Sequence, residues 1–446
     1  MNVKRNILLF MLISSVIVSY PVLTVINRST TIYLVEDRTY NIETIAEFPI
    51  ERIEGNMSII VFTSPDSSYD VLVNLINSAK NDIKIEIYSI YNPYLLKALN
   101  DAIKRGVSVN VITEKYHASS FENNRNIWAA WNLTQAGASV YWSNDTEFAY
   151  THAKMAIIDS SLTVIMSGNW VKTGVPVHSS YGNREWGVVI NNSDVADYFI
   201  DVFIEDLSIA RPYSTSDGNG TSVSGYIPHG QYPHPFTSDT FQGYFEVTPV
   251  VSPDTSETLI RQLIDSANET LEIAQLYIYK NWGTSLSPFV TDIVEAAQRG
   301  VKVRILLNNG SSPNEDLVQH LQSYENIAVA YSNDTYFENY HVKGVIVDGK
   351  IVLVSSINWS KTSVRSNRET GVIIKGKDVA MYFRNIFNWD WSVSKVVFNN
   401  IVNATEETHS QPSGEEGAGW LSIIIETGIA GIIIAIIVFI LKSRKK

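Results

Sequence analysis

The chain carries one short polar pattern twice, and its residue types suit phosphoryl transfer. Each copy has a histidine, a lysine two positions later and an aspartate five positions after the lysine. The two copies are His152, Lys154 and Asp159, then His341, Lys343 and Asp348. Alternate side chains of a strand share one face, so the histidine and lysine of each copy point the same way. An imidazole beside a fixed cation suits nucleophilic attack on phosphorus with stabilisation of the developing charge.

An asparagine and a glutamate follow each copy at matching places. Asn169 and Asn358 each lie 17 residues after their histidine, and Glu185 and Glu369 each end an Asn-Arg-Glu step. An asparagine amide can donate to phosphate oxygens, and a glutamate can accept a hydrogen bond from an imidazole N–H and fix its tautomer. The alternative role for each glutamate is a surface salt bridge with the arginine that precedes it.

Two imidazoles that converge across a pseudo-twofold axis can divide a reaction between them. One would attack phosphorus and form a phosphohistidine, while the other protonates the leaving oxygen and then deprotonates the incoming alcohol or water. Lys154 and Lys343 supply positive charge at the phosphate, so we expect neither a metal ion nor another cofactor. Asp159 and Asp348 end their strands at tight turns, where turn and capping hydrogen bonds are the expected role.

The duplication extends beyond the two motifs. Ser-Pro-Asp at 64–66 recurs at 252–254, and Ser-Asn-Asp-Thr at 143–146 recurs at 332–335. Hydrophobic spacing, β-branched runs and helix-ending glycines predict the same elements in each unit. The expected helices are 68–80, 93–105, 255–268 and 288–299, and the expected strands before the motifs are 83–88, 107–112, 271–279 and 301–307. This alternation predicts a mostly parallel sheet, covered by helices, in each unit.

The doubled motif resembles the defining pattern of the phospholipase D superfamily, which is H-x-K-x4-D followed by a G/S-x-N step and a glutamate. The resemblance covers residues from about 60 to 395. It implies an α/β fold of two tandem phospholipase-D-like α/β/α sandwich repeats packed around one shared active site. It also implies a phosphohistidine route in which His152 is the nucleophile and His341 is the general acid.

The motif and the resemblance together define the expected site. The expected catalytic residues are His152, His341, Lys154, Lys343, Asn169, Asn358, Glu185 and Glu369. Many relatives carry a hydroxyl group two residues after the asparagine, which makes Ser360 a candidate substrate-binding residue. Val171 stands at that place in the first half, so the sequence predicts an asymmetric site.

Both ends of the chain are apolar and flanked by basic residues. The first run predicts a signal peptide or signal anchor over 1–30. The second run, 420–441, is long enough to span a bilayer as a transmembrane helix, which leaves a basic tail at 442–446 on the cytoplasmic side. We therefore expect a cell-membrane protein whose catalytic body is extracytoplasmic. The body divides into a first repeat at 57–210, an inter-repeat loop at 211–243, a second repeat at 244–395 and a stalk at 396–419.

The amino-acid composition limits which partners and chemical groups the catalytic body is expected to use. The 446 residues include 46 acidic and 34 basic side chains, and six of the basic ones flank the apolar ends, so the body is strongly acidic. A general nucleic-acid binder would show a basic surface. The chain has no cysteine, which excludes disulfides, thiol catalysis and cysteine-bound zinc. Repeated Asn-x-Ser/Thr sequences favour a glycosylated exterior.

These observations favour a phosphodiesterase or phosphatidyltransferase that acts on phospholipids or related phosphodiesters at a membrane. Four tryptophans are candidates for lipid contact, although tryptophans pack in cores and rims more often. They are Trp128, Trp131, Trp142 and Trp282. The first alternative is an extracellular metal-independent nuclease, with nucleic acid as the substrate. The second is a non-catalytic surface receptor with a relict site, against which two intact motifs argue. Hydrolysis and transfer to an alcohol both remain open.

The lysine-based site predicts a metal-independent activity. Treatment with EDTA should leave the turnover of a phosphodiester nearly unchanged, because the two ammonium groups carry the charge that a metal ion would otherwise provide. Turnover would be measured before and after chelation and again after Mg²⁺ is restored. A complete loss that Mg²⁺ reverses would contradict the prediction.

Overall fold

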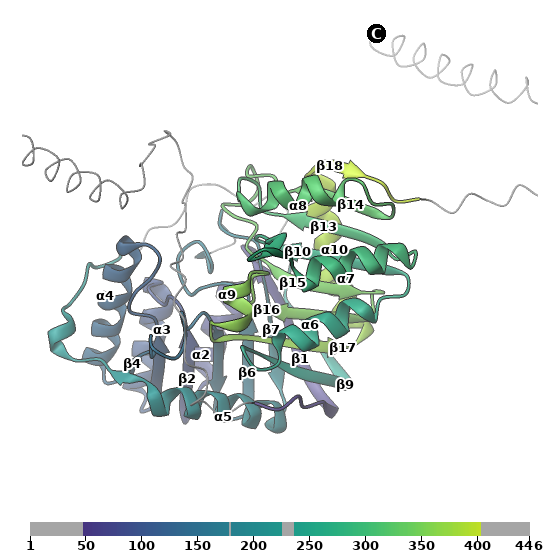
Figure 1. Cartoon of the computed structure of the whole chain (residues 1–446). Coiled ribbons are helices and arrows are strands. Elements are labelled where there is room, and N and C mark those ends of the chain that lie inside the picture. The colour runs from purple at the N-terminus through teal and green to yellow at the C-terminus, as the bar shows by residue number, and fades with distance from the viewer. Residues whose placement is uncertain (1–47, 178–179, 225–235, 403–446) are drawn as a thin grey trace, which may run out of the picture. The chain divides into compact units, whose positions relative to one another are not determined.

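A single large sheet runs through both repeats in this computed structural model, which describes residues 48–177, 180–224 and 236–402 (Figure 1). The first repeat comprises β1 (Ile53–Ser64), α2 (Ser68–Ser78), β2 (Asp82–Ile87), α3 (Pro93–Lys104), β3 (Ser108–Thr113), α4 (Ser120–Ala136), β4 (Ser139–Trp142), β5 (Lys154–Ile158), β6 (Leu162–Met166), β7 (Glu185–Asn191) and α5 (Ser193–Ile209). The short elements β8 (Arg211–Pro212) and η3 (Thr215–Asp217) follow.

The second repeat keeps this order of elements with four additions. It comprises β9 (Asp239–Ser252), α6 (Ser256–Asp265), β10 (Thr270–Gln275), β11 (Asn281–Trp282), β12 (Ser285–Leu286), α7 (Pro288–Gln298), β13 (Lys302–Leu307), α8 (Pro313–Leu321), β14 (Ile327–Tyr331), β15 (Lys343–Val347), β16 (Ile351–Ser355), α9 (Lys361–Arg365), β17 (Glu369–Lys375), α10 (Lys377–Val393) and β18 (Lys395–Asn399). The additions are β11, β12, α9 and β18. Both repeats belong to one compact unit that ends at Ile401.

The strand order shows how the repeats are joined. Within the described residues the order is β18-β14-β13-β10-β15-β16-β17-β9-β1-β7-β6-β5-β2-β3-β4-β8. The long strands β1 and β9 pair antiparallel at the centre, and the order on one side mirrors the order on the other. The sheet is therefore continuous across the pseudo-twofold axis.

The prediction of a mostly parallel sheet in each unit is wrong. Parallel pairing occurs in β2-β3-β4 and in β10-β13-β14, whereas the remaining neighbours in the sheet pair antiparallel. The strands β5, β6 and β7, like β15, β16 and β17, follow one another in antiparallel pairs. The only helix assigned in their described connections is the short α9 between β16 and β17, whereas a parallel pair requires a crossover connection of a dozen or more residues.

Alternation along the strands separates three cores. Along β5, Ala156 and Ile158 pack into a core with α2, α3 and α4, whereas Met155 and Ile157 face a second core. That second core is shared by both repeats and contains Phe199 of α5 and residues of α10. A third core lies under α6, α7 and α8. Helices thus cover both faces of each half-sheet, as Figure 1 shows for the labelled helices, which confirms the α/β/α sandwich.

Local sequence signals explain where the helices begin and end. The side chain of Asn92 accepts hydrogen bonds from the first backbone N–H groups of α3, with Pro93 at the first helical position. Gly106 and Gly300 follow α3 and α7 with φ angles of 95° and 93°, a left-handed conformation that glycine adopts without strain. The four predicted helices are confirmed, with ends within a few residues of those expected.

The two motif aspartates lie in the turns that follow β5 and β15. Asp159 Oδ1 accepts hydrogen bonds from the backbone N–H groups of Asn81 at 2.7 Å and Asp82 at 3.2 Å. Asp348 Oδ1 does the same for Glu269 at 2.8 Å and Thr270 at 2.9 Å. Each carboxylate ties the turn to the start of the neighbouring strand, which places the motif strand in register.

Two predicted boundaries need correction. The expected loop at 211–243 contains β8, η3 and the first residues of β9. The expected stalk at 396–419 begins as a strand. β18 pairs antiparallel with β14, satisfies the backbone groups of β14 and forms the outermost strand of the sheet. The predicted segments 1–30, 420–441 and 442–446 lie outside the described residues. Within the described ranges, every helix is too short or too polar to traverse a membrane.

The aspartate turns predict a stability effect that is separate from catalysis. Asp348→Ala should lower the free energy of unfolding by about 1–3 kcal/mol, because several backbone N–H groups lose their acceptor. Asp348→Asn should cost less, because asparagine keeps an oxygen acceptor and tolerates the φ of 52° at this position. Urea unfolding of the two variants beside the matched Asp159 variants measures both effects. Equal stability of Asp348→Ala and the unaltered protein would contradict the assignment.

Candidate active site

The two histidines lie where the repeats meet. The backbone N–H of His152 donates to the carbonyl oxygen of Arg368 at 2.7 Å, and that of His341 donates to the carbonyl oxygen of Arg184 at 3.0 Å. Each histidine is therefore held by the backbone of the other repeat. The two motif copies meet in one shared site, as the fold class predicted.

The imidazole–carboxylate pairs cross between the repeats. His152 Nδ1 lies 2.8 Å from Glu369 Oε2, and His341 Nδ1 lies 2.8 Å from Glu185 Oε1. A neutral imidazole that donates from Nδ1 to a carboxylate presents the lone pair of Nε2 for chemistry. The sequence predicted the two kinds of residue, but it did not indicate which glutamate serves which histidine.

Each glutamate is held by a serine and an asparagine that sequence reasoning did not single out. Ser167 and Ser356 donate to Oε2 of Glu185 and Glu369, both at 2.6 Å. The donors to the other carboxylate oxygens are Asn183 for Glu185, at 3.2 Å, and Asn367 for Glu369, at 3.0 Å. Their recurrence at matching places in both repeats was the available signal. These bonds fix each carboxylate before it meets the imidazole.

The surface salt bridge considered for the glutamates is wrong. Arg184 and Arg368 are fully buried and bind aspartates instead. The guanidinium of Arg184 lies 2.6 Å from Asp66 and 2.9 Å from Asp390. Because consecutive side chains of a strand point to opposite faces, an arginine next to its glutamate projects away from the imidazoles.

Both motif lysines are buried with their charge uncompensated by a salt bridge within the described structure. Lys154 Nζ donates to the carbonyl oxygen of His152 at 2.6 Å, and Lys343 Nζ donates to that of His341 at 2.6 Å. Burial lowers the pKa of Lys154 to about 8 and that of Lys343 to about 7, although Glu369 and Glu185 oppose the shift. An anion that enters the site would regain the electrostatic energy that these ammonium groups lost on burial.

Burial also keeps the histidines neutral at rest. It lowers the pKa of His152 to about 4, against the opposing effect of Glu369, and it lowers the pKa of His341 for the same reason. Burial would raise the pKa of Glu185, but His341, Lys343 and Ser167 outweigh it and lower the pKa. The histidine that acts as the acid must therefore gain its proton when an anionic phosphate arrives.

The remaining predicted site residues are the two motif asparagines and Ser360, and only Ser360 has its side-chain oxygen engaged in hydrogen bonds within the described structure. The side-chain oxygens of Asn169 and Asn358 are buried and have no hydrogen-bond partner among the described residues, and the donor role of their amides toward phosphate remains a prediction. Ser360 caps α9: its hydroxyl accepts from Ser363 N and donates to Ser363 Oγ, both at 3.1 Å. That arrangement directs Ser360 toward the helix, and its role toward substrate remains a prediction.

Within the described part of the chain, an aromatic ring packs against His152, and no ring contact of this kind is found for His341. The ring of Tyr88 lies 5.0 Å from that of His152 and 5.8 Å from that of Tyr150. The equivalent positions of the second repeat, by strand register, are Leu276 and Asn339. The predicted asymmetry is thus larger than the Val171–Ser360 difference. Of the tryptophans considered for lipid contact, Trp142 and Trp282 are buried, so these two have a packing role.

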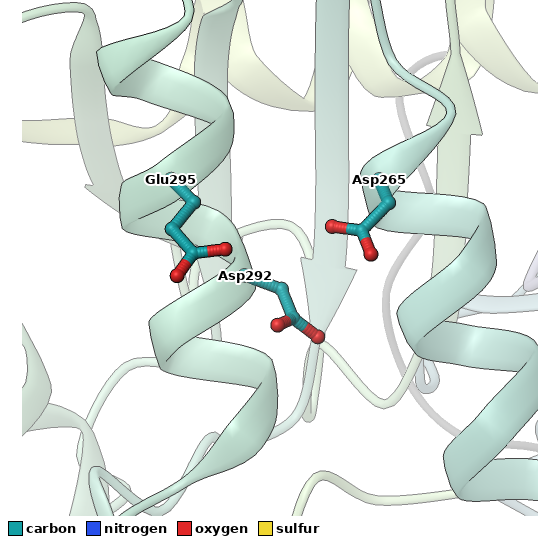
Figure 2. A group of neighbouring side chains, drawn as sticks. All are labelled: Asp265, Asp292 and Glu295. Carbon is teal, nitrogen blue, oxygen red and sulfur yellow. The ribbon is translucent and has the colours of Figure 1, made fainter.

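One group of carboxylates within the described residues has the spacing of a metal site, but it is remote from the histidines. Asp265 at the end of α6 faces Asp292 and Glu295 of α7 (Figure 2). α6 leads into the start of β10, whereas Lys343 pairs with Gln275 at the other end of that strand. Arg261 already binds Asp292 at 2.8 Å. This group therefore has no part in the histidine site.

Comparisons with known proteins agree with this geometry. The family described as "Cardiolipin synthase, PLD-like domain" matches residues 72–207 and 260–391, one match in each repeat. The chain therefore belongs to the family of proteins with phospholipase-D-like domains.

Curated relatives match a smaller part of the chain. A mitochondrial cardiolipin hydrolase of Chlamydomonas reinhardtii is 25% identical over 32% of the chain and 60% of the relative. A phospholipase D of Rickettsia prowazekii is 30% identical over 27% of the chain and 58% of the relative. A virion nicking-joining enzyme of Vaccinia virus is 27% identical over 31% of the chain and 34% of the relative. The matches thus span less than two thirds of each relative.

Solved structures share the fold over most of the described chain. The phosphatidylserine synthase of Haemophilus influenzae superposes with a TM-score of 0.57 at 15% identity, over 76% of this chain and 87% of that one. The polyphosphate kinase of Porphyromonas gingivalis gives 0.54 at 16% identity, over 78% and 50%. At these identities the likeness concerns the fold alone.

The low pKa values of the buried lysines predict an alkaline limb in the activity. As pH rises through the pKa of Lys343, about 7, and of Lys154, about 8, the free enzyme loses charge that binds phosphate. We expect kcat/KM to fall about tenfold for each pH unit between these two pKa values and more steeply above both, because kcat/KM reports the free enzyme. Lys343→Arg stays charged and should move the limb toward the pKa of Lys154. A profile that stays flat up to the usual pKa of lysine would contradict this prediction.

Proposed function

We propose that the protein is a phosphodiesterase or phosphatidyltransferase that acts on phospholipids through a phosphohistidine intermediate. The observation that carries the proposal is the crossed arrangement of His152–Glu369 and His341–Glu185 beside two buried lysines. The site therefore combines two neutral imidazoles, each oriented by a carboxylate, with two lysine ammonium groups that have no salt-bridge partner within the described structure. A phosphodiester supplies the anion that this site requires.

The first step breaks the bond between phosphorus and the leaving oxygen. Nε2 of His152 attacks phosphorus, while Nδ1–H donates to Glu369 and stabilises the positive charge that develops on the ring. His341, protonated once the anionic phosphate is bound, gives its proton to the leaving oxygen. Lys154 and Lys343 lie close enough to both rings to balance the charge on the non-bridging oxygens.

The second step reverses these roles. His341, now neutral, takes a proton from water or an alcohol, and the new oxygen attacks the phosphohistidine. His152 leaves as a neutral imidazole, and the product carries either a free phosphate ester or a new ester. Water and an alcohol can both serve as acceptor, so hydrolysis and transfer are two outcomes of the same site.

Names of relatives support the lipid substrate, and one of them supports a second candidate. Relatives named cardiolipin hydrolase and phospholipase D, together with the family description, favour a phospholipid. The virion nicking-joining enzyme favours a nucleic acid. The acidic balance of the chain favours the lipid, because a nucleic-acid groove needs positive charge. The proposal includes membrane anchoring and an extracytoplasmic catalytic body, which the apolar terminal segments of the sequence support.

A direct test assays the full chain in detergent and in vesicles of phosphatidylcholine, phosphatidylglycerol and cardiolipin, and separately with single- and double-stranded DNA. His152→Ala and His341→Ala should each lower lipid turnover by more than about 10³-fold without unfolding the protein. His320→Ala, on α8, is the matched control and should retain activity. DNA cleavage that requires both histidines, without lipid turnover, would establish the nuclease instead.

The order of the two histidines has its own test. A p-nitrophenyl phosphodiester has a leaving group that departs without a proton, so His341→Ala should still form the covalent intermediate and accumulate it. Mass spectrometry after acid-free quenching should locate the adduct on His152. An adduct on His341 in the His152→Ala variant, and none in His341→Ala, would reverse the assignment.

A further inference from the structure

A buried polar cluster lies directly behind His152, and the reaction does not use it. Glu86 of β2 is 1% exposed, and Thr151 Oγ1 donates to its Oε1 at 2.7 Å. Asp206 of α5 lies against Glu86 and accepts a hydrogen bond from Arg368 at 2.9 Å. Arg368 also binds Asp254 at 2.7 Å. The guanidinium group of Arg368 therefore binds two carboxylates, and the carboxyl group of Glu86 lies against one of them.

The contacts of this cluster require a proton on one of its two touching carboxyl groups, Glu86 or Asp206. Oε2 of Glu86 has no hydrogen-bond donor among the described side chains and backbone groups, and its neighbour Asp206 is itself an acceptor. Two buried carboxylates in contact repel unless one of them carries a proton. Burial, and then the charge of Asp206, raise the pKa of Glu86 well above its usual value. Arg368 contacts both carboxylate oxygens of Asp206, at 2.9 and 2.8 Å, which favours the charged form of Asp206 and assigns the shared proton to Glu86.

In the second repeat, different residues lie beside the buried aspartate that binds the arginine. Strand register places Ala274 where the first repeat has Glu86, and Tyr340 precedes His341 as Thr151 precedes His152. The hydroxyl of Tyr340 lies beside Asp390, which binds Arg184 as Asp206 binds Arg368. Each buried aspartate therefore has a neighbouring group that can present a neutral O–H. A phenol and an alanine in one repeat correspond to a threonine and a carboxylic acid in the other.

The cluster is connected to the backbone of the histidine. Thr151 forms a parallel bridge with Arg368, and the next residue, His152, donates its N–H to the carbonyl of Arg368. A change in the bonding of Glu86 would therefore reach both the Thr151 side chain and the residue that positions His152.

We propose that Glu86 is a positioning residue for His152: as an uncharged carboxylic acid it donates a hydrogen bond to Asp206 and accepts one from Thr151. This proposal rests on the proposed role of His152. Glu86 does for the first repeat what the Tyr340 hydroxyl does for the second. The nucleophile's side of the site thereby has a buried glutamate where the other side has Ala274 and the Tyr340 phenol.

Three variants separate positioning from a general loss of structure. Glu86→Gln keeps a neutral donor and an acceptor, so kcat should stay within about threefold of the unaltered protein. Glu86→Ala should lower kcat by about 10- to 100-fold with little change in KM, because the nucleophile is misplaced while the lysines still bind phosphate. Glu86→Ala combined with Thr151→Tyr copies the second repeat and should recover most of the loss. A Glu86→Gln variant as impaired as Glu86→Ala would overturn the proposal.

Two measurements do not depend on turnover. The Nδ1 proton of His152, which bonds to Glu369, should keep its downfield NMR resonance in Glu86→Gln and lose or shift it in Glu86→Ala. The infrared band of a protonated carboxylic acid at neutral pH should weaken in Glu86→Gln. If the unaltered protein turns over no substrate, the proposed function fails, and these spectra still decide the role of Glu86. An unchanged resonance in Glu86→Ala, or an unchanged band in Glu86→Gln, would overturn the inference.

The pH dependence of stability provides the last comparison. The groups that face Glu86 are Asp206 of α5, Thr151, and Arg368 with its partner Asp254. The native state holds the proton of Glu86 above the unfolded pKa of about 4.5, so its contribution to stability is present below that pH and is lost as pH rises. Glu86→Gln lacks this loss, and its melting temperature relative to the unaltered protein should rise with pH. A difference that is independent of pH would overturn the neutral-acid assignment.

Discussion

Two ammonium groups and two carboxylates are buried together where the repeats meet, and the rest of the site depends on this shared removal from water. Burial of an isolated charge costs several kcal/mol, which only close opposite charges and hydrogen bonds offset. Glu185 and Glu369 each accept hydrogen bonds from a serine and an asparagine and contact an imidazole nitrogen. The two lysines donate hydrogen bonds to backbone carbonyl oxygens. The carboxylates are satisfied within the protein, but the ammonium groups are not paired with them. The site therefore has a defined place for one further anion.

The arginines behind the glutamates hold this arrangement together. Arg184 belongs to the first repeat and binds Asp390 of α10, whereas Arg368 belongs to the second and binds Asp206 of α5. Loss of one partner of such a buried pair typically costs about 3–5 kcal/mol, because a charge is left uncompensated. The ion pairs and the crossed histidine–glutamate pairs run between the same two halves. Neither half could complete the site alone. The antiparallel pairing of β1 with β9 joins the two halves in one sheet.

Duplication with divergence gives the two histidines different surroundings. The first half-site has Tyr88, Tyr150 and the neutral Glu86, while the second has Leu276, Asn339 and Tyr340. A two-step reaction needs one imidazole to attack and the other to exchange protons, so equivalent environments would offer no reason for a division of roles. The outer parts of each repeat keep the same order of strands and helices, because they form a separate core under their own helices.

The sequence alone determined four of the helices, the two repeats, the chemical types in the site and the turns at Asp159 and Asp348. Each of these depends on local patterns: periodic burial, helix-ending glycine, and motifs that recur at a constant interval. The sequence did not indicate the antiparallel majority of the sheet, since strand neighbours are chosen by contacts between distant segments. It also did not show that Lys395–Asn399 completes a sheet edge. The crossing of His152 to Glu369, the burial of Arg184 and the proton on Glu86 were decided by tertiary structure, because each arises only when groups far apart in the chain are desolvated together.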